Sequence, residues 1–119
     1  GPTGLWNMAR LGLPVLVVIY NNHAYGGPHN RVINAVPDNR MVQEGRYFID
    51  YLGKPDMNMA EIASGFGVDG EQVESPGQLQ EALKRGRRAN DSGKPYLIDA
   101  QVARTGVGWA EEPWVPQLT

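Results

Sequence analysis

The sequence predicts an α/β fold in which helices connect parallel strands. Two observations predict it: residues 15–20 are apolar at every position, and helical and strand-like segments alternate along the rest of the chain. Such alternation implies parallel strands joined by right-handed crossovers. The expected order is helix, strand, long loop, helix, strand, helix, strand, built around one hydrophobic core in a chain of 119 residues.

The first helix and the first strand are expected before residue 21. An apolar helical face is followed by Gly12, which is placed to end the helix, and by Pro14, which cannot continue it. The residues of this face are Leu5, Met8, Ala9 and Leu11. The run over residues 15–20 is rich in β-branched residues, and a run of this kind suits a strand covered on both faces. We therefore expect it to be a buried, central strand.

Helix-start signals recur in the second half of the chain. Asn58 and Glu61 have the spacing of a capping box, and Ser75 with Pro76 supplies a cap and a favoured first helical residue. The expected apolar sides are Ala60, Ile62, Ala63 and Phe66 in the first helix, which Gly65 and Gly67 weaken and end, and Leu79, Ala82 and Leu83 in the second. Both segments are therefore predicted to be amphipathic helices packed on the sheet.

Two more strands are expected, at residues 68–74 and 96–102. The first is a weak candidate because Asp69-Gly70 interrupts it, whereas the second follows a turn over residues 93–95. With only three strands visible, the sheet would keep a long apolar edge unpaired. We expect that this chain is part of a longer polypeptide or that a partner completes the sheet.

Composition excludes several classes of function. The chain has no cysteine, which excludes disulfides, thiol nucleophiles and thiolate metal sites. Its net charge is −2 and its pI about 5.6, so no basic surface argues for nucleic acid or an acidic membrane. We interpret the basic residues over 84–88 as a solvated helix end, because they complement the negative end of the helix dipole. Without a membrane-length apolar run or a signal-peptide pattern, a cytoplasmic protein is expected.

Residues 27–55 have no clear periodicity. Val32, Ile33 and Val36 fit one side of a short helix begun at Pro28, and residues 37–39 fit a turn. A segment of this length is long for a connection in a compact domain and is often a lid or a binding loop. Two short surface helices, packing their aromatic side chains on the sheet or on a neighbour, are an equally good interpretation.

Asn21 and Asn22 follow the first predicted strand, where ligands of open α/β sheets bind. An asparagine oxygen is a neutral, hard ligand for magnesium or calcium, and glycine-rich backbone can offer amides to phosphate. A simple turn is the competing interpretation, since Asn tolerates and Gly permits left-handed backbone. On this local pattern alone, the simple turn is favoured.

Residues 13–26 also resemble the second half of the signature of thiamine diphosphate-dependent enzymes, in which Asn-Asn follows Gly-Asp-Gly after roughly two dozen residues. The closest likeness is to the benzoylformate decarboxylase and acetolactate synthase group, from about Gly4 to Val102. The resemblance implies a three-layer, doubly wound parallel sheet, the thiamine diphosphate-binding fold, which is incomplete here. Residues 1–102 would be the C-terminal part of a diphosphate-binding domain, and residues 103–119, with Trp109 and Trp114, an extended tail.

The cofactors implied by the resemblance are thiamine diphosphate and Mg²⁺. Asn22 would give its side-chain oxygen, and Ala24 its main-chain carbonyl, to a magnesium ion that bridges the two phosphates. Tyr25 and Gly26 would line the diphosphate, and Asn21 would secure the turn. A hard divalent cation needs few protein ligands here, because the phosphates supply the other oxygens. Ala24 replaces the glycine or other small residue usual in the family, but a carbonyl ligand does not depend on its side chain.

Two acidic groups of the resembled family are missing from this chain. The aspartate of Gly-Asp-Gly, a ligand of the metal, would fall upstream of Gly1, and the glutamate that activates the cofactor belongs to another domain, usually of another subunit. His23 and His29 are candidate catalytic residues, since histidine relays protons near neutral pH. Histidine in a polar loop is more often a surface hydrogen-bonding residue, and that interpretation is favoured.

Two functions follow from the resemblance. The first is the diphosphate- and magnesium-binding part of a 2-oxo acid decarboxylase or an acetolactate synthase-like carboligase. Its partners would be a 2-oxo acid and the remaining domains or a partner subunit, in a homo-oligomer. The second is a non-catalytic α/β fragment or degenerate relative with a role in assembly or regulation. The missing acidic groups favour the second for this chain alone, whereas the Asn-Asn element favours the first for its parent protein.

Overall fold

The computed structural model describes residues 1–46 and 50–103 of the chain. Its helices are α1 (Thr3–Leu11), α2 (Gly26–Ala35), α3 (Arg40–Glu44), α4 (Met59–Gly65) and α5 (Pro76–Asp91). Its strands are β1 (Leu16–Asn21), β2 (Asp69–Val73) and β3 (Tyr96–Gln101). No helix within these described residues has the length and apolar character needed to cross a membrane.

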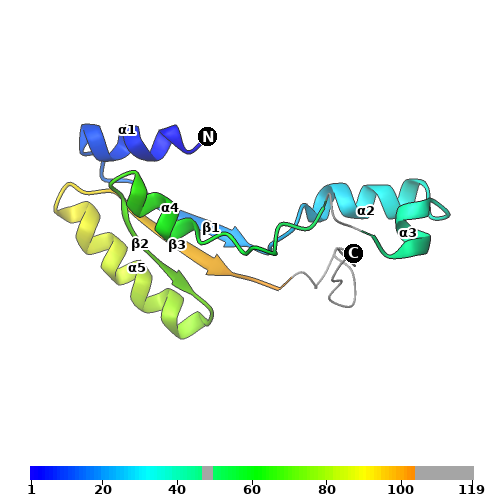
Figure 1. The fold of residues 1–119 in the computed structure, drawn as a ribbon. Helices are drawn as coiled ribbons and strands as arrows, with labels where there is room; N and C mark the ends of the chain where they lie inside the picture. Colours follow the sequence, from blue (N-terminus) through cyan, green and yellow to red (C-terminus); the bar gives the residue numbers. More distant parts are fainter. Residues whose placement is uncertain (47–49, 104–119) are drawn as a thin grey trace. The chain divides into compact units, whose positions relative to one another are not determined.

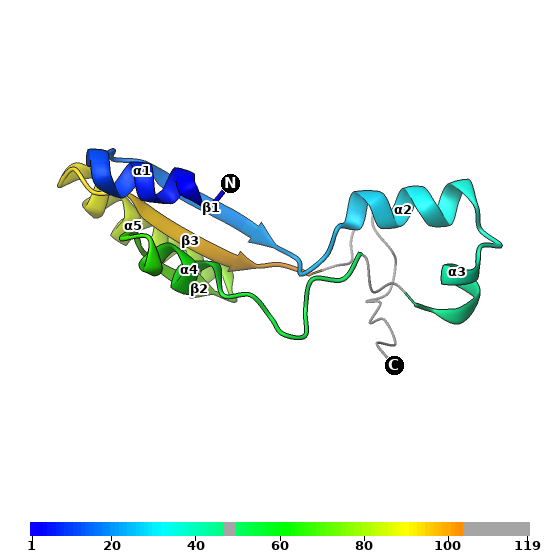
Figure 2. The same ribbon diagram turned by 45° about the horizontal axis from the view of Figure 1, so that its top comes forward.

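The three strands form one parallel sheet in the order β1-β3-β2, and their arrows point the same way in Figures 1 and 2. Tyr96 of β3 lies opposite Leu16 of β1 on one side and Asp69 of β2 on the other. Strands β1 and β2 follow each other in the chain but are separated in the sheet by β3. The predicted α/β class with parallel strands is confirmed.

Helices cover both faces of this sheet. On one face, Ala60 and Ala63 of α4 form a buried cluster with Leu97 of β3, and Ala9 of α1 packs against it. On the other face, Ala82 of α5 forms a second cluster with Ile98, Ala100 and Val73. Figure 1 accordingly has α1 and α5 on opposite sides of the strands. The arrangement is three layers, helix, sheet and helix, because successive side chains of β3 point to opposite faces.

The position of the first strand differs from the prediction. Strand β1 is an edge strand of the described sheet, and most of its residues are half-buried, whereas β3 is central and four of its six residues are buried. An unbroken apolar run indicates that both faces of a strand are covered, but it carries no information about strand order. Here β3 receives neighbours on both edges and helices on both faces, so it is the buried strand.

The helix-start signals are confirmed. The side chain of Asn58 accepts a hydrogen bond from the Glu61 N–H at 3.0 Å, and Ser75 Oγ accepts one from the Gln78 N–H at 3.3 Å. Two predicted core positions are wrong, because Ile62 and Leu83 are each 40% exposed. Small residues occupy the buried positions instead, Ala60 and Ala63 in α4 and Ala82 and Gly86 in α5, and they permit close approach to the sheet.

A polar cluster joins α5 to the sheet. Arg85 donates two hydrogen bonds to Glu71 of β2, both at 2.7 Å, and the hydroxyl of Tyr96 donates one to Glu71 at 2.9 Å. The hydrogen bonds from Arg85, and then the one from Tyr96, hold the pKa of Glu71 below its ordinary value. Burial, and then the hydrogen bond to Glu71, raises the pKa of Tyr96. Arg85 therefore binds the sheet, whereas Arg88 is the basic residue in the last turn of α5.

One fully buried carboxylate fixes the start of α4. Asp99 of β3 is 0% exposed, and its Oδ2 accepts the main-chain N–H of Met59 at 3.1 Å. Gln72 Nε2 of β2 lies 3.5 Å from the same oxygen. A buried carboxylate needs such donors because it has lost its hydration. Asp99 therefore fixes the point at which the chain returns to the sheet.

The chain divides into two compact units. The sheet unit contains Gly1–Asn21 and Asn58–Val102, and the loop unit contains Asn22–Met57. In the loop unit, α2 begins two residues before Pro28, and α3 is capped by Asn39, whose side chain accepts the Val42 N–H at 3.0 Å. Short helices in this segment are thus confirmed, whereas a lid function stays a prediction. The predicted tail lies outside the described residues apart from Ala103, and the boundary at residue 102 stays a prediction.

Candidate metal and diphosphate site

The residues predicted to bind the metal lie in a tight turn at the start of the loop unit. We call residues 22–26 the site turn. Asn22 is half-buried, and its Oδ1 accepts the main-chain N–H of Ala24 at 3.1 Å. His23, between them, has a left-handed backbone with φ of 53°. The two predicted metal ligands, Asn22 and Ala24, are therefore joined directly by a hydrogen bond.

A second segment, residues 50–52, pairs with the site turn in antiparallel fashion. We call it the strap. Ala24 lies opposite Tyr51 in this pairing. The Tyr25 N–H donates to the Asp50 carbonyl at 2.7 Å, and the Leu52 N–H donates to the His23 carbonyl at 2.7 Å. Sequence analysis did not identify the strap, because nothing local in residues 50–52 indicates a partner so far away along the chain.

The two strap hydrogen bonds determine which way the groups of Ala24 point. In a planar trans peptide, the C=O and the N–H point in opposite directions. Because the Tyr25 N–H is turned toward Asp50, the Ala24 carbonyl of the same peptide is turned away from the strap. By the same argument the Ala24 N–H is turned away from Leu52, and there it meets Asn22 Oδ1. Both predicted ligand oxygens thus lie on the side of Ala24 that faces away from the strap.

The Ala24 carbonyl accepts no hydrogen bond from the described residues. Four residues further on is Pro28, which has no N–H, so α2 cannot extend backward to use this carbonyl. Asn22 Oδ1 has two lone pairs, of which the Ala24 N–H uses one. A hard cation such as magnesium prefers oxygen ligands of this kind. The residues present therefore fit such a cation.

Both candidate ligands are neutral. In the part of the chain that the structure describes, no group of three or more His, Cys, Asp or Glu side chains is placed to hold a metal. A divalent cation at the site turn would thus need negatively charged oxygens from elsewhere. Phosphate groups are a suitable source, since magnesium is commonly bound by few protein ligands together with substrate phosphates.

The start of α2 is suited to an anion. Gly26 is buried and is the first residue of the helix, and no side chain caps this end. The first N–H groups of a helix have no partner within it and attract phosphate. The Tyr25 N–H is already used by Asp50, so Tyr25 would offer a diphosphate its side chain, in a residue that is 56% exposed.

The two histidines have different surroundings. His23 Nδ1 lies 3.3 Å from Oδ1 of the exposed Asp56. His29, in α2, is buried, and its Nδ1 lies 3.4 Å from Oδ2 of the equally buried Asp50. Sequence analysis did not single out Asp50, because it lies in a stretch without periodicity. A catalytic role for His23 or His29 stays a prediction.

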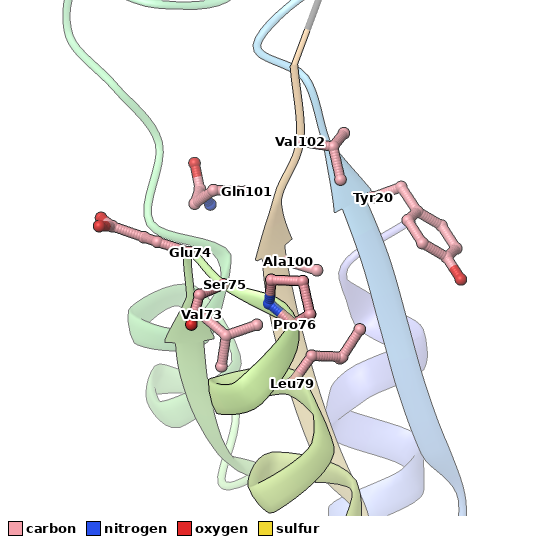
Figure 3. Close-up of a pocket in the computed structure, with 9 residues that line it drawn as sticks. All are labelled: Tyr20, Val73, Glu74, Ser75, Pro76, Leu79, Ala100, Gln101 and Val102. Atoms are coloured by element: carbon pink, nitrogen blue, oxygen red, sulfur yellow. The ribbon is translucent and has the colours of Figure 1, made fainter.

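The sheet unit has a separate cavity of about 180 Å³ at the carboxyl ends of β2 and β3. Figure 3 shows that its walls come from these strands, from the end of β1 and from the start of α5. The larger side chains are Tyr20, Leu79 and Val102, and the walls are mainly apolar. None of the predicted cofactor or metal ligands lines this cavity, and mainly apolar walls do not suit a diphosphate.

Comparisons with known proteins give matches over most of the chain. A family model described as "Thiamine pyrophosphate enzyme, C-terminal TPP binding domain" matches residues 2–100. The "Putative acetolactate synthase large subunit IlvX" of Mycobacterium tuberculosis is 32% identical over 100 residues, which are 84% of this chain and 19% of that protein. The "Probable acetolactate synthase large subunit" of Methanococcus aeolicus is 26% identical over 95 residues, covering 80% of this chain and 14% of that protein.

A solved structure shares the fold. It is the thiamine diphosphate-dependent 4-hydroxybenzoylformate decarboxylase of Rhodococcus jostii, with a TM-score of 0.68 and 23% sequence identity. The match covers 87% of this chain and 17% of the decarboxylase chain. The chain thus spans less than a fifth of the length of each of these three proteins.

Proposed function

Since the chain belongs to the thiamine pyrophosphate enzyme family, whose C-terminal TPP-binding domain it matches over residues 2–100, we propose that it is the diphosphate- and magnesium-binding part of a 2-oxo acid decarboxylase or an acetolactate synthase-like carboligase. Two relatives are named as acetolactate synthase large subunits, and the structural neighbour is named as a decarboxylase. These names support both reaction types. The substrate would accordingly be a 2-oxo acid.

The pair of oxygens on the site turn carries this proposal. Asn22 Oδ1, held by the Ala24 N–H, and the Ala24 carbonyl, turned away from the strap, would bind Mg²⁺. The N–H of Gly26 at the start of α2 would bind the diphosphate, with the exposed side chain of Tyr25 beside it. Bound thiamine diphosphate would supply stabilisation of the carbanion left when a 2-oxo acid loses CO₂. His23 and His29 would move protons near the site.

The remaining parts of such a site would come from other polypeptide segments. The chain spans less than a fifth of its relatives, and both of its proposed metal ligands are neutral. We therefore propose that a carboxylate ligand and the group that activates the cofactor are contributed by other domains or by a partner subunit. An arrangement of that kind would make a homo-oligomer the working form.

Calorimetric titration of thiamine diphosphate, with Mg²⁺ and again with excess chelator, tests the proposal. We expect binding that requires magnesium and that weakens at least about tenfold in Asn22→Ala, because a direct ligand is lost. Asn7→Ala is the matched control, since Asn7 is exposed on α1 in the sheet unit. Equal affinity with and without magnesium, or equal affinity of the two variants, would contradict the proposed site.

A non-catalytic role in assembly or regulation is the second candidate. It is favoured by the lack of an acidic metal cluster in the described residues and by the half-exposed edge strand β1. The same titration separates the two. A chain that is folded by circular dichroism and binds no thiamine diphosphate at millimolar magnesium would support this second role for the chain.

A further inference from the structure

Asp50 and His29 form a buried polar pair. The proposed function uses His29 as a proton carrier and assigns nothing to its contact with Asp50. The side chains are only 5% and 3% exposed, and Asp50 Oδ2 lies 3.4 Å from His29 Nδ1. The two atoms do not form a hydrogen bond, so the contact is a close polar pair. Removing the imidazole would leave the buried carboxylate without this polar neighbour, which is costly. The pair therefore constrains both residues to stay together, although one belongs to the strap and the other to α2.

Main-chain hydrogen bonds link the same two residues to Tyr25. The Tyr25 N–H donates to the Asp50 carbonyl at 2.7 Å, and the His29 N–H donates to the Tyr25 carbonyl at 3.0 Å. Together with the His29–Asp50 pair, these contacts form a closed ring of three residues. The ring connects the strap, the site turn and the first turn of α2, so none of the three can move without straining one of the contacts.

One member of this ring, the Tyr25 N–H, belongs to the same peptide group as the Ala24 carbonyl. The Tyr25 N–H and the Ala24 C=O belong to one planar group, so the direction of one determines the direction of the other. An isolated antiparallel pairing with two hydrogen bonds is weak by itself. The side-chain pair adds a third attachment, which keeps the Asp50 carbonyl in reach of Tyr25.

We infer that His29 and Asp50 are positioning residues: their buried pair fixes the peptide between Ala24 and Tyr25 and thereby orients the Ala24 carbonyl toward a divalent cation. The cation as the ligand of the Ala24 carbonyl rests on the proposed function. The fixed orientation of the carbonyl does not depend on it. Groups that support a metal ligand from behind commonly change metal affinity by 10–100-fold when they are removed.

Amide hydrogen exchange of the Tyr25 N–H, measured by NMR on the chain without cofactor, tests the fixed peptide. We expect exchange at least about tenfold faster in Asp50→Ala and in His29→Gln, because the ring opens. Asp38→Ala is the control, as Asp38 is an exposed aspartate of the same unit. His29→Asn should stay close to the unchanged chain, since its amide nitrogen is attached to Cγ as Nδ1 is. If Asp50→Ala does not fold, the difference in Tyr25 exchange between His29→Asn and His29→Gln tests the inference.

The inference is overturned if the Tyr25 amide exchanges equally fast in His29→Gln and in Asp38→Ala. It is also overturned if the amide exchanges equally fast in His29→Asn and in His29→Gln, because the cause would then be lost packing and not a lost polar pair. The metal is tested by the Mg²⁺ concentration that gives half-maximal thiamine diphosphate binding, which should rise about 10–100-fold in Asp50→Ala. Faster exchange with an unchanged magnesium requirement would overturn the orienting role. If the chain without substitutions exchanges its Tyr25 amide slowly but binds no cofactor, the proposed function is contradicted and the fixed peptide is supported.

Discussion

The sheet unit and the loop unit keep their residues in place by different interactions. In the sheet unit, buried apolar side chains form a cluster on each face of β3. Among the described residues of the loop unit, the buried ones are Gly26, His29 and Asp50, and none of them has an apolar side chain. The sheet unit therefore depends on burial, and the described part of the loop unit depends on hydrogen bonds. Changes in the first should alter global stability, and changes in the second should alter local order and binding.

The largest effect on stability is expected from Ile98→Ala. Ile98 is 0% exposed at the centre of β3, so its truncation leaves a cavity and should reduce the free energy of unfolding by about 2–4 kcal/mol. Urea denaturation measures the loss. Ile62→Ala is the control, since Ile62 is 40% exposed and should cost less than about 1 kcal/mol. Similar losses in both variants would mean that the cluster around Ile98 does not carry the stability of the unit.

A smaller loss is expected from Gly70→Ala in β2. A Cβ at Gly70 would lie 2.6 Å from the carbonyl oxygen of Leu97, a main-chain atom of the neighbouring strand, so the strands must shift. We expect a loss of about 1–3 kcal/mol in the same measurement. In Gly77→Ala the new methyl group meets nothing within 4 Å and lies in α5, where alanine is favoured over glycine. Gly77→Ala should therefore be neutral or stabilising, and a loss equal to that of Gly70→Ala would contradict close packing at Gly70.

The next effect depends on pH. The Arg85 hydrogen bonds lower the folded-state pKa of Glu71 from 4.5, so the stabilisation is present above that value and is lost as the pH falls through the lowered folded pKa. We expect the stability of the unchanged chain to fall more between pH 7 and pH 3 than that of Glu71→Gln. The difference should be smaller than the loss in Gly70→Ala, because the ion pair is partly exposed. Glu74→Gln, an exposed site, should retain the full pH dependence; a loss of pH dependence there would assign the effect to another group.

The smallest effect on global stability is expected from Asn22→Ala, the variant with the largest expected effect on cofactor binding. Asn22 contributes one hydrogen bond, to the Ala24 N–H, in a unit whose described residues include no buried apolar side chain. Its loss should reduce the free energy of unfolding by less than about 1 kcal/mol. A loss as large as that of Ile98→Ala would break the distinction between the two units.

Much of the sheet unit could be predicted from sequence because its signals are local. Asn58, Ser75 and Gly12 mark helix ends through their own side chains or backbone freedom, and the structure has helix ends at these places. Strand order is not local, and for that reason β1 was wrongly expected at the centre. The assignment of Ile62 and Leu83 to the core failed because the buried faces carry small residues, which give a weaker pattern than the large residues beside them. These small residues are Ala60, Ala63, Ala82 and Gly86.

The candidate site also has a part that could be predicted from sequence and a part that could not. Asn22 and Ala24 could be proposed from a resemblance over a short, continuous stretch, and the structure joins them by a hydrogen bond. Asp50 and Tyr51 could not, since they contact the site turn from a segment far along the chain and without periodicity. The consequence of Pro28 could have been found from sequence, because its missing N–H prevents α2 from extending backward to the Ala24 carbonyl.

The contact between Asp99 and Met59 has a consequence for how the loop unit can change. Asn21 is fixed by its pairing opposite Gln101, and Met59 is fixed by the Asp99 carboxylate, so both ends of the intervening segment are anchored within the sheet unit. The entropy lost on closing such a loop grows only with the logarithm of its length, about 0.6 kcal/mol for each doubling. Insertions and deletions between residues 22 and 57 should therefore cost the sheet unit little. The same anchored sheet can carry loops of quite different length and chemistry.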